Sequence, residues 1–265
     1  MFVRACFSAV LILGCVANSS ALGEICRWVD HGQTHRWNDP ANWQNGHIPG
    51  SDDRFVSTPY YAMRPDWGLY RVLIDSTVWA ECNNAKNMNQ LVMDIVGGSL
   101  TVYNEWKIGQ DNGQGAVINM SGGSVYVGGY VDLGGWAEGQ SMGTLNMTGG
   151  TFTIGGALKM GCWDTTRSYL NLDGGTVGVG SLQFGGAPAV IDITEGVLAL
   201  AGDQRGSVEY YVNSGHIRAY GGGVGVMYDY GETKPGWTTV RAIPEPATAV
   251  LLGLGVLLVR KRKRS

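Results

Sequence analysis

The residues best suited to metal binding or acid–base chemistry lie near the start of the chain, between positions 30 and 53. Imidazole and carboxylate groups are common zinc ligands and common proton carriers. The group contains three histidines and four aspartates: His31, His35, His47, Asp30, Asp39, Asp52 and Asp53. Their spacing matches no standard metal motif, and Asp beside Pro and Gly is typical of turns and caps. We therefore expect no metal, no cofactor and no catalytic residue here.

Four charged residues in the middle of the chain would be the candidates for an enzyme that cleaves polysaccharides: Lys107, Asp132, Lys159 and Asp173. A glycosidase needs two carboxyl groups, and a lyase needs a Lys or Arg base, gathered on one face of the fold. Along the sequence these residues are scattered through regular repeats, which leave little room for a site. The sequence therefore predicts that the protein is not an enzyme, with a lyase or glycosidase as the lesser alternative.

Glycine organises the elements that would position these side chains. It accounts for 42 of 265 residues and interrupts an alternation of apolar and polar residues. A nine-residue phrase with a central Gly-Gly pair recurs four times, and a fifth copy keeps one glycine. The second glycine, or its equivalent, advances by 25, 27, 25, 21 and 19 residues if a sixth copy is included. The copies span 94–102, 119–127, 146–154, 171–179, 192–200 and, as the sixth candidate, 212–219.

A second glycine-ended element keeps the same phase, at residues 107–109, 132–134, 159–161 and 183–185. Each repeat therefore predicts three short strands separated by glycine corners, which is typical of one rung of a parallel β-helix. We expect an all-β fold, a β-solenoid of about six or more rungs. An antiparallel meander or sandwich is the alternative, because Gly-Gly also suits hairpin turns. A polar residue that recurs before the Gly-Gly pair is expected to form a side-chain ladder: Asp94, Asn119, Asn146, Asn171 and Asp192.

The segment 24–90 precedes the repeats and is rich in Trp and Pro. Its phrase Trp37-Asn38-Asp39-Pro40-Ala41-Asn42-Trp43 is similar to a stretch that opens many exported bacterial β-helical and autotransporter-like proteins. We interpret 24–90 as an N-terminal cap with the first rungs, because solenoids need caps at their open ends. Residues 91–220 then hold the Gly-rich repeats. Residues 221–243 are expected to form closing strands and a linker.

Three tryptophans near rung ends, Trp106, Trp136 and Trp163, are expected to pack against the fold, and a strip that stacks on sugars is the alternative. Cysteine is sparse in the body, with Cys26, Cys82 and Cys162, and no CxxC pair supports a zinc site. We expect these thiols to be buried small apolar groups or to form at most one disulfide, whose pairing the sequence does not fix.

The N-terminus has the features of an export signal. Arg4 precedes an apolar stretch, and Ser19-Ser20-Ala21 supplies small residues for cleavage. Residues 1–23 are therefore predicted to be a signal peptide. A lipoprotein signal ending at Cys15 is an alternative.

The C-terminus combines three features in a fixed order: Pro244-Glu245-Pro246, an apolar run over 247–259, and a cluster of five cationic residues, Arg260, Lys261, Arg262, Lys263 and Arg264. The apolar run spans roughly 20 Å as a helix, less than the ~30 Å hydrocarbon core of a bilayer. The cationic cluster favours a cytoplasmic C-terminus, with the preceding chain outside.

This order of features resembles the PEP-CTERM sorting signal of Gram-negative bacteria that secrete exopolysaccharide, over residues 244–265. The resemblance implies that an exosortase recognises the sorting motif 244–246, that the 247–259 helix enters the inner membrane transiently, and that the basic cluster 260–264 stops transfer. Whether the tail is then removed or retained is left open. The marginal length of the apolar run favours a transient sorting handle.

Charge and location narrow the function. Residues 24–243 carry 13 Lys and Arg against 21 Asp and Glu, a net charge of −8, so nucleic acid is not an expected partner. We expect a non-catalytic structural protein of the cell surface or extracellular matrix, with an exosortase and exopolysaccharide as partners. The alternative is an adhesin that binds glycans or cells. An exposed aromatic row would favour the adhesin.

Overall fold

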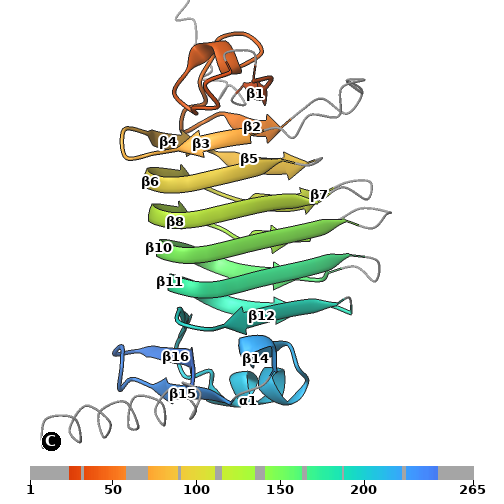
Figure 1. Ribbon diagram of the computed structural model, residues 1–265, viewed down its shortest axis with the longest axis vertical. Helices are drawn as coiled ribbons and strands as arrows, with labels where there is room; N and C mark the ends of the chain where they lie inside the picture. Colours follow the sequence, from red (N-terminus) through yellow and green to blue (C-terminus); the bar gives the residue numbers. More distant parts are fainter. Residues whose placement is uncertain are drawn as a thin grey trace, which may run out of the picture.

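The chain winds into a β-solenoid. The computed structural model describes residues 24–30, 33–57, 71–88, 91–110, 115–134, 141–162, 166–186, 188–222 and 225–243. These residues form an all-β solenoid of about six turns, with the rungs stacked along the long axis (Figure 1). Neighbouring rungs pair in parallel, which confirms the predicted β-helix and excludes an antiparallel meander for the repeats. The predicted signal peptide (1–23) and tail helix (247–259) lie outside the described residues.

Three parallel ladders form the three faces of the solenoid, because each rung contributes a strand or a part of a strand to each face. The first face contains β3 (Arg71–Ile74), then the first parts of β6 (Val92–Val102), β8 (Ala116–Val127), β10 (Met142–Met160) and β11 (Arg167–Phe184), and then β12 (Ala189–Ile193) and β14 (Ile217–Ala219). The second contains β4 (Trp79–Cys82), the next parts of β6, β8, β10 and β11, and β13 (Val197–Ala201).

The third face begins at the N-terminal end of the stack and continues to the last parts of β10 and β11. Its own strands are β1 (Ile25–Trp28), β2 (Arg54–Ser57), β5 (Asn84–Met88), β7 (Trp106–Gln110) and β9 (Val131–Leu133). Residues of the second glycine-ended element are aligned on this face, since Lys107 pairs with Asp132, Asp132 with Lys159, and Lys159 with Gln183.

The Gly-Gly pairs form the corner between the first and second faces. Gly123 has φ of 79°, and a Cβ atom there would lie 2.5 Å from the carbonyl oxygen of Gly97 in the rung before it. A side chain at this position would therefore meet both a strained backbone and a neighbouring rung. This double constraint explains why glycine marks the period of the repeat.

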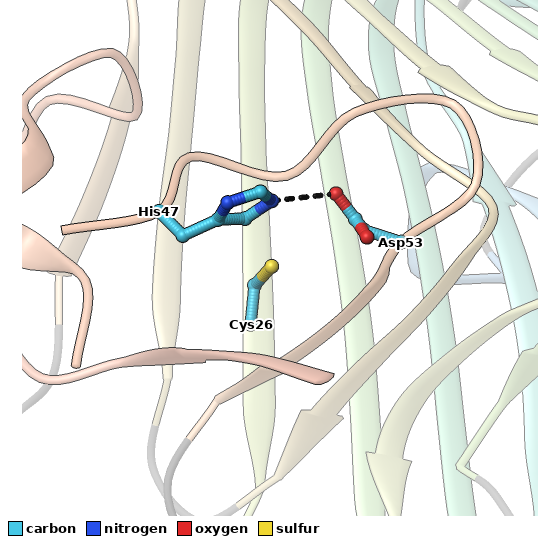
Figure 2. A group of neighbouring side chains, drawn as sticks. All are labelled: Cys26, His47 and Asp53. Atoms are coloured by element: carbon cyan, nitrogen blue, oxygen red, sulfur yellow. Dashed lines mark hydrogen bonds and ion pairs between the residues drawn. The ribbon is translucent and has the colours of Figure 1, made fainter. Parts of the chain in front are cut away.

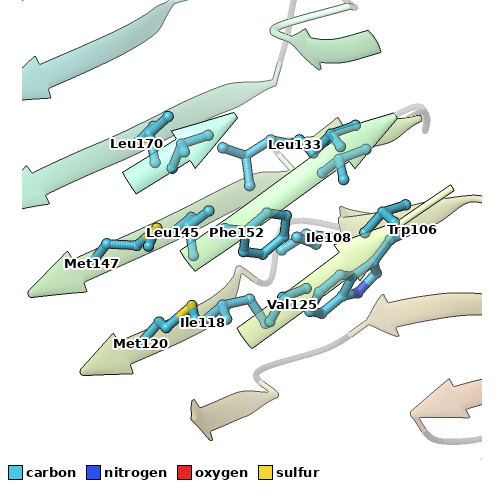
Figure 3. Close-up of a cluster of buried hydrophobic side chains, with 14 of the residues drawn as sticks. Trp106, Ile108, Ile118, Met120, Val125, Leu133, Leu145, Met147, Phe152 and Leu170 are labelled. Carbon is cyan, nitrogen blue, oxygen red and sulfur yellow. The ribbon is translucent and has the colours of Figure 1, made fainter. Parts of the chain in front are cut away.

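Inward-facing side chains of successive rungs stack into one continuous core. Met120, Met147 and Leu172 occupy equivalent positions on the first face, and each is buried. Figure 3 shows how side chains from β7, β8, β9 and β10 meet in the middle of the solenoid. There the Trp106 ring stacks on Phe152, with centroids 5.6 Å apart. No rung could bury its apolar face alone, so the stack forms as a unit.

The predicted polar ladder is present on the outside of the first face. The Nδ2 group of each asparagine donates to the side-chain oxygen of the residue one rung earlier: Asn119 to Asp94 (2.9 Å), Asn146 to Asn119 (2.9 Å) and Asn171 to Asn146 (2.8 Å). Asp192, the last expected member, instead accepts from Arg218 Nε at 2.8 Å. The ladder therefore joins four rungs, from Asp94 to Asn171, and its first member Asp94 also accepts from Arg71 Nε at 3.0 Å.

An aromatic cluster covers the N-terminal end of the stack. Trp28, Trp37, Trp43 and Phe55 are buried and meet edge to face, with ring centroids 4.9 to 5.6 Å apart. Asp39 caps the short helix η1 (Pro40–Asn42) by accepting from the Ala41 amide. The Trp-rich phrase thus folds into a compact turn over the first rungs, and Asp39 serves as a cap, as the sequence indicated.

The C-terminal end is closed by a helix and an antiparallel pair: α1 (Arg205–Asn213), η2 (Tyr220–Gly222), β15 (Val226–Tyr230) and β16 (Trp237–Ala242). β16 pairs antiparallel with β13 and with β15. The sixth repeat copy is wrong, because residues 205–213 are helical and Ile217 pairs with Ile191, not with Leu198. Gly215 lies just after the end of α1 and has φ of 78°. The glycine that suggested a sixth copy therefore belongs to a helix terminus and not to a corner between strands.

Candidate functional site

The sorting segment begins where the folded body ends. β16 finishes at Ala242, and the Ile243 amide donates to the Gly225 carbonyl at 3.0 Å. The body is therefore tied down as far as residue 243. The predicted sorting residues themselves lie outside the described residues: Pro244, Glu245, Pro246, Arg260, Lys261, Arg262, Lys263 and Arg264.

A charged cluster lies on the outside of the third face. Lys107, Asp132 and Lys159 occupy equivalent positions on β7, β9 and β10, so three residues scattered in sequence lie side by side. The fourth, Asp173, lies elsewhere and accepts from Thr194 Oγ1 at 2.7 Å. The parallel register explains the gathering, because positions one period apart coincide on one face.

The charges of this cluster are engaged with one another. Glu105 pairs with Lys107 Nζ at 3.1 Å and accepts a hydrogen bond from Tyr130, and Lys159 Nζ lies 4.0 Å from the Tyr130 ring centroid. Burial opposes ionisation of Glu105, but the donors from Tyr130 and Lys107 outweigh it and lower its pKa.

Asp132 is the buried member of the cluster. It is only 6% exposed, and its Oδ1 atom has no hydrogen-bond partner. Burial raises the pKa of Asp132, although Lys159 and Lys107 act in the opposite direction. The same burial raises the pKa of the neighbouring Cys162 thiol to about 11. Two carboxyl groups whose pKa values are shifted in opposite directions resemble a catalytic acid–base pair. In this cluster, however, Glu105 is bound by Lys107 and Tyr130, and Asp132 is buried.

A second cluster lies at the N-terminal end, where Cys26, His47 and Asp53 converge. Their ligand atoms, one from each side chain, all lie within 4.8 Å of one another. Cys26 is on β1, Asp53 directly precedes β2, and His47 is in the loop between these strands. Figure 2 shows the Cys26 sulfur near the gap between the His47 ring and the Asp53 carboxylate. In the part of the chain that the structure describes, no other group of three such side chains is as close.

Hydrogen bonds hold the carboxylate of this second cluster. Asp53 accepts from the Glu24 amide at 2.8 Å, the Gly50 amide at 3.0 Å and His47 Nε2 at 2.8 Å. Partial burial opposes ionisation of Asp53, but these donors lower its pKa. The hydrogen bond to Asp53 raises the pKa of His47. Burial, followed by the negative charges of Asp53 and Glu24, raises the pKa of the Cys26 thiol to about 12.

The sequence alone does not predict that these three residues lie together. By sequence, His47 and Asp53 belong with the other histidines and acids near the start of the chain, and Cys26 is expected to be a buried apolar group. The intervals of 21 and 6 residues match no motif because parallel pairing of β1 with β2 creates the proximity. Among the other candidates, His35 pairs with Asp30 at 2.8 Å, Asp39 caps η1, Asp52 is exposed, and His31 lies outside the described residues.

The cysteines are thiols in the structure, with Cys26 and Cys82 buried and Cys162 half-buried. Burial raises the pKa of Cys82 to about 12. These thiols are therefore protonated and weakly nucleophilic at neutral pH.

Exposed aromatic side chains occur on the second face. Trp79 on β4 is 84% exposed, and Tyr126 on β8 and Tyr103, just after β6, are about half exposed. The Tyr103 hydroxyl donates to Glu81 at 3.0 Å. Of the three tryptophans named from the sequence, Trp106 is completely buried and does not contribute to this surface, and Trp136 and Trp163 lie outside the described residues. Sugar stacking by Trp106 is therefore wrong.

Comparison with known proteins identifies one segment. A family model for the PEP-CTERM protein-sorting motif matches residues 242–264, which confirms the resemblance inferred from the tail. The motif implies exosortase-dependent sorting of an exported protein, with anchoring in the membrane through the C-terminus. Neither the curated proteins nor the solved structures that were searched gave a match. None of the helices in the described ranges combines the length and apolar character of a membrane span.

Proposed function

We propose, from the sorting motif at residues 242–264, that this chain is a non-catalytic structural protein of the cell surface or extracellular matrix, associated with exopolysaccharide. The observation that carries the proposal is the junction at Ala242, where the last strand of a complete solenoid body meets the motif. The folded body therefore ends along the chain where the motif begins, with an overlap at Ala242 and Ile243. Such an arrangement suits a protein that folds outside while its tail remains in the membrane.

The character of the body supports a structural role. Its first face carries a polar ladder of side-chain hydrogen bonds, and Glu105, Lys107 and Lys159 are occupied by contacts within their own cluster. Asp132 is buried, and burial raises its pKa above the ordinary carboxyl value. A glycosidase would need two accessible carboxyl groups on either side of a bound sugar.

The sorting step is tested in the native host by mass spectrometry of the C-terminus of the protein on the cell surface. We expect a C-terminus near residues 244–246, with residues 260–264 missing. The variant P244A/P246A should retain the tail and stay with the membrane, whereas Pro235→Ala, in the exposed turn between β15 and β16, should be processed normally. An intact tail on the surface-exposed wild-type protein would refute processing.

The non-catalytic role is tested by incubating the protein with purified exopolysaccharide from the host. We expect co-sedimentation without new reducing ends or unsaturated sugar products. Release of either product would establish an enzyme, and a failure to co-sediment would remove the association with exopolysaccharide.

A second candidate function is a glycan-binding adhesin, because three exposed aromatic residues lie on successive rungs: Trp79 and Tyr126 on the second face, and Tyr103 just after the end of β6. Aromatic faces stack on sugar rings, and Trp79 has its surface available for such contact. Under this reading, Trp79→Ala weakens retention on a glycan column at least about tenfold, which corresponds to ~1.4 kcal/mol. Thr153→Ala, on the same face one rung beyond Tyr126, is the control.

A further inference from the structure

We propose that Cys26, His47 and Asp53 form a zinc site that joins the first strand of the solenoid to the loop before β2. The proposal is independent of the sorting function. It rests on the convergence of three different ligand types, with ligand atoms within 4.8 Å of one another (Figure 2).

The ligand set selects the metal. Thiolate, imidazole and carboxylate are the three protein ligands that zinc takes in tetrahedral sites. A thiol and an imidazole disfavour calcium and magnesium, which prefer oxygen. Zinc–ligand bonds of ~2.0 to 2.3 Å place tetrahedral ligand atoms roughly 3.2 to 3.7 Å apart. The Cys26 sulfur would therefore move closer by up to about 1 Å, whereas His47 Nε2 and Asp53 Oδ2, now 2.8 Å apart, would separate slightly as zinc replaces the proton between them.

The surroundings provide both rigidity and access. Backbone amides of Glu24 and Gly50 donate to the Asp53 carboxylate and fix its orientation, as hydrogen-bond donors behind the ligands do in zinc sites. Cys26 is 4% exposed and fixed on β1, whereas the His47 side chain is 47% exposed. The histidine can thus adjust as the ion enters from solvent, and water can take the fourth position.

The local charge also favours a cation. The thiol of Cys26 faces the negative charges of Asp53 and Glu24, which together with burial keep it protonated. A divalent ion at this point would reverse that effect and stabilise the thiolate. Within the described residues, β1 is the terminal strand of the third face, and β2 is its one parallel partner, so a bound ion would tie this end strand to the rest of the solenoid.

The test uses the full chain, purified in mild detergent under reducing conditions and stripped with a chelator. Cobalt(II) serves as the spectroscopic probe. We expect one equivalent to produce a near-ultraviolet thiolate-to-cobalt charge-transfer band, which one equivalent of zinc then removes. Zinc should also raise the midpoint of thermal unfolding.

Two histidine variants provide a matched comparison. His47→Gln should weaken zinc binding by at least about tenfold and abolish the thermal shift. His35→Gln should leave both unchanged, because His35 makes the same kind of pair with Asp30 but is not in a three-ligand group. Cys26→Ala should remove the charge-transfer band, with folding checked by circular dichroism.

Three results would overturn the site. These are no stoichiometric zinc binding by the reduced wild-type chain, a charge-transfer band that persists in Cys26→Ala, or equal losses in the His47 and His35 variants. The surface position of His47 keeps the test decisive even if Cys26→Ala fails to fold.

Discussion

Replacement of Gly123 by alanine tests whether close contact between rungs, and not only backbone conformation, requires glycine at the corners. Gly123 has φ of 79°, and its added Cβ would lie 2.5 Å from the Gly97 oxygen and 2.6 Å from the Gly98 oxygen. Gly202 offers a matched control, because its φ is 75° but no atom lies within 4 Å of the added Cβ. Both variants incur the left-handed backbone cost of ~1–2 kcal/mol.

Only Gly123→Ala adds the steric cost of forcing two rungs apart, about 1–3 kcal/mol by analogy with overpacked cores. We therefore expect a total loss of ~2–5 kcal/mol for Gly123→Ala and ~1–2 kcal/mol for Gly202→Ala. Urea unfolding followed by circular dichroism measures both values. Amide hydrogen exchange should locate the Gly123 loss in β6 and β8, since rungs interact with their nearest neighbours. Equal losses for the two variants, within ~0.5 kcal/mol, would refute the close-contact explanation.

Three further predictions concern polar contacts. Asn146→Ala breaks two ladder hydrogen bonds and Asn171→Ala breaks one, so urea unfolding should show losses of about 2 and about 1 kcal/mol. Thr144→Ala, two residues earlier on the same face of β10, should cost less than either, and a larger loss there would contradict the ladder's role. Asp132→Asn should stabilise the protein by ~1 kcal/mol at pH 7, because a buried carboxylate whose Oδ1 atom has no hydrogen-bond partner is removed. Because the pKa of Asp132 is raised in the folded protein, its contribution to stability is complete below the ordinary carboxyl pKa and is lost as pH rises. The stability gained by Asp132→Asn should therefore vanish near pH 3. A gain in stability that is independent of pH would argue against this cause. Asp229 accepts from the Thr233 amide and from the Thr233 and Thr239 hydroxyls; the Thr239 hydrogen bond is the largest of the causes that lower its pKa to about 2. The contribution of Asp229 to stability is therefore present above the ordinary carboxyl pKa and is lost as pH falls toward 2. Asp229→Asn should remove this pH dependence of stability, as measured by hydrogen exchange in β15 and β16.

Regular features of the repeats were predictable because each depends on a local pattern. The alternation around Gly122-Gly123 predicted strands and a corner, and the phase of the copies predicted the parallel register of Asn119 with Asn146. The hydrogen-bonded ladder followed from this register. The sixth repeat copy, around Gly215, was predicted wrongly for an equally local reason. In the sequence, a glycine that follows a helix cannot be distinguished from a glycine at a corner between strands.

The candidate sites were not predictable to the same degree. Lys107, Asp132 and Lys159 look scattered along the sequence, although their shared phase in the repeats, 25 and 27 residues apart, places them in one column on the third face. Cys26, His47 and Asp53 have no period, since they lie in the cap, where each turn of the chain is unique. Exposure also depended on the fold: Trp106 is buried against Phe152, whereas Trp79, not singled out as a possible sugar-stacking residue, is exposed.

The sequence by itself determined the solenoid and the sorting motif, since both are written in short, contiguous or periodic phrases: glycine corners, alternating apolar residues, and the ordered tail from Pro244 to Arg264. Only the tertiary structure decided which side chains meet across rungs and in the cap. The physical reason is that such contacts depend on which strands pair and on how the loops of different length between them are folded. Proximity of Cys26 to Asp53 follows from the pairing of β1 with β2, which no local signal specifies.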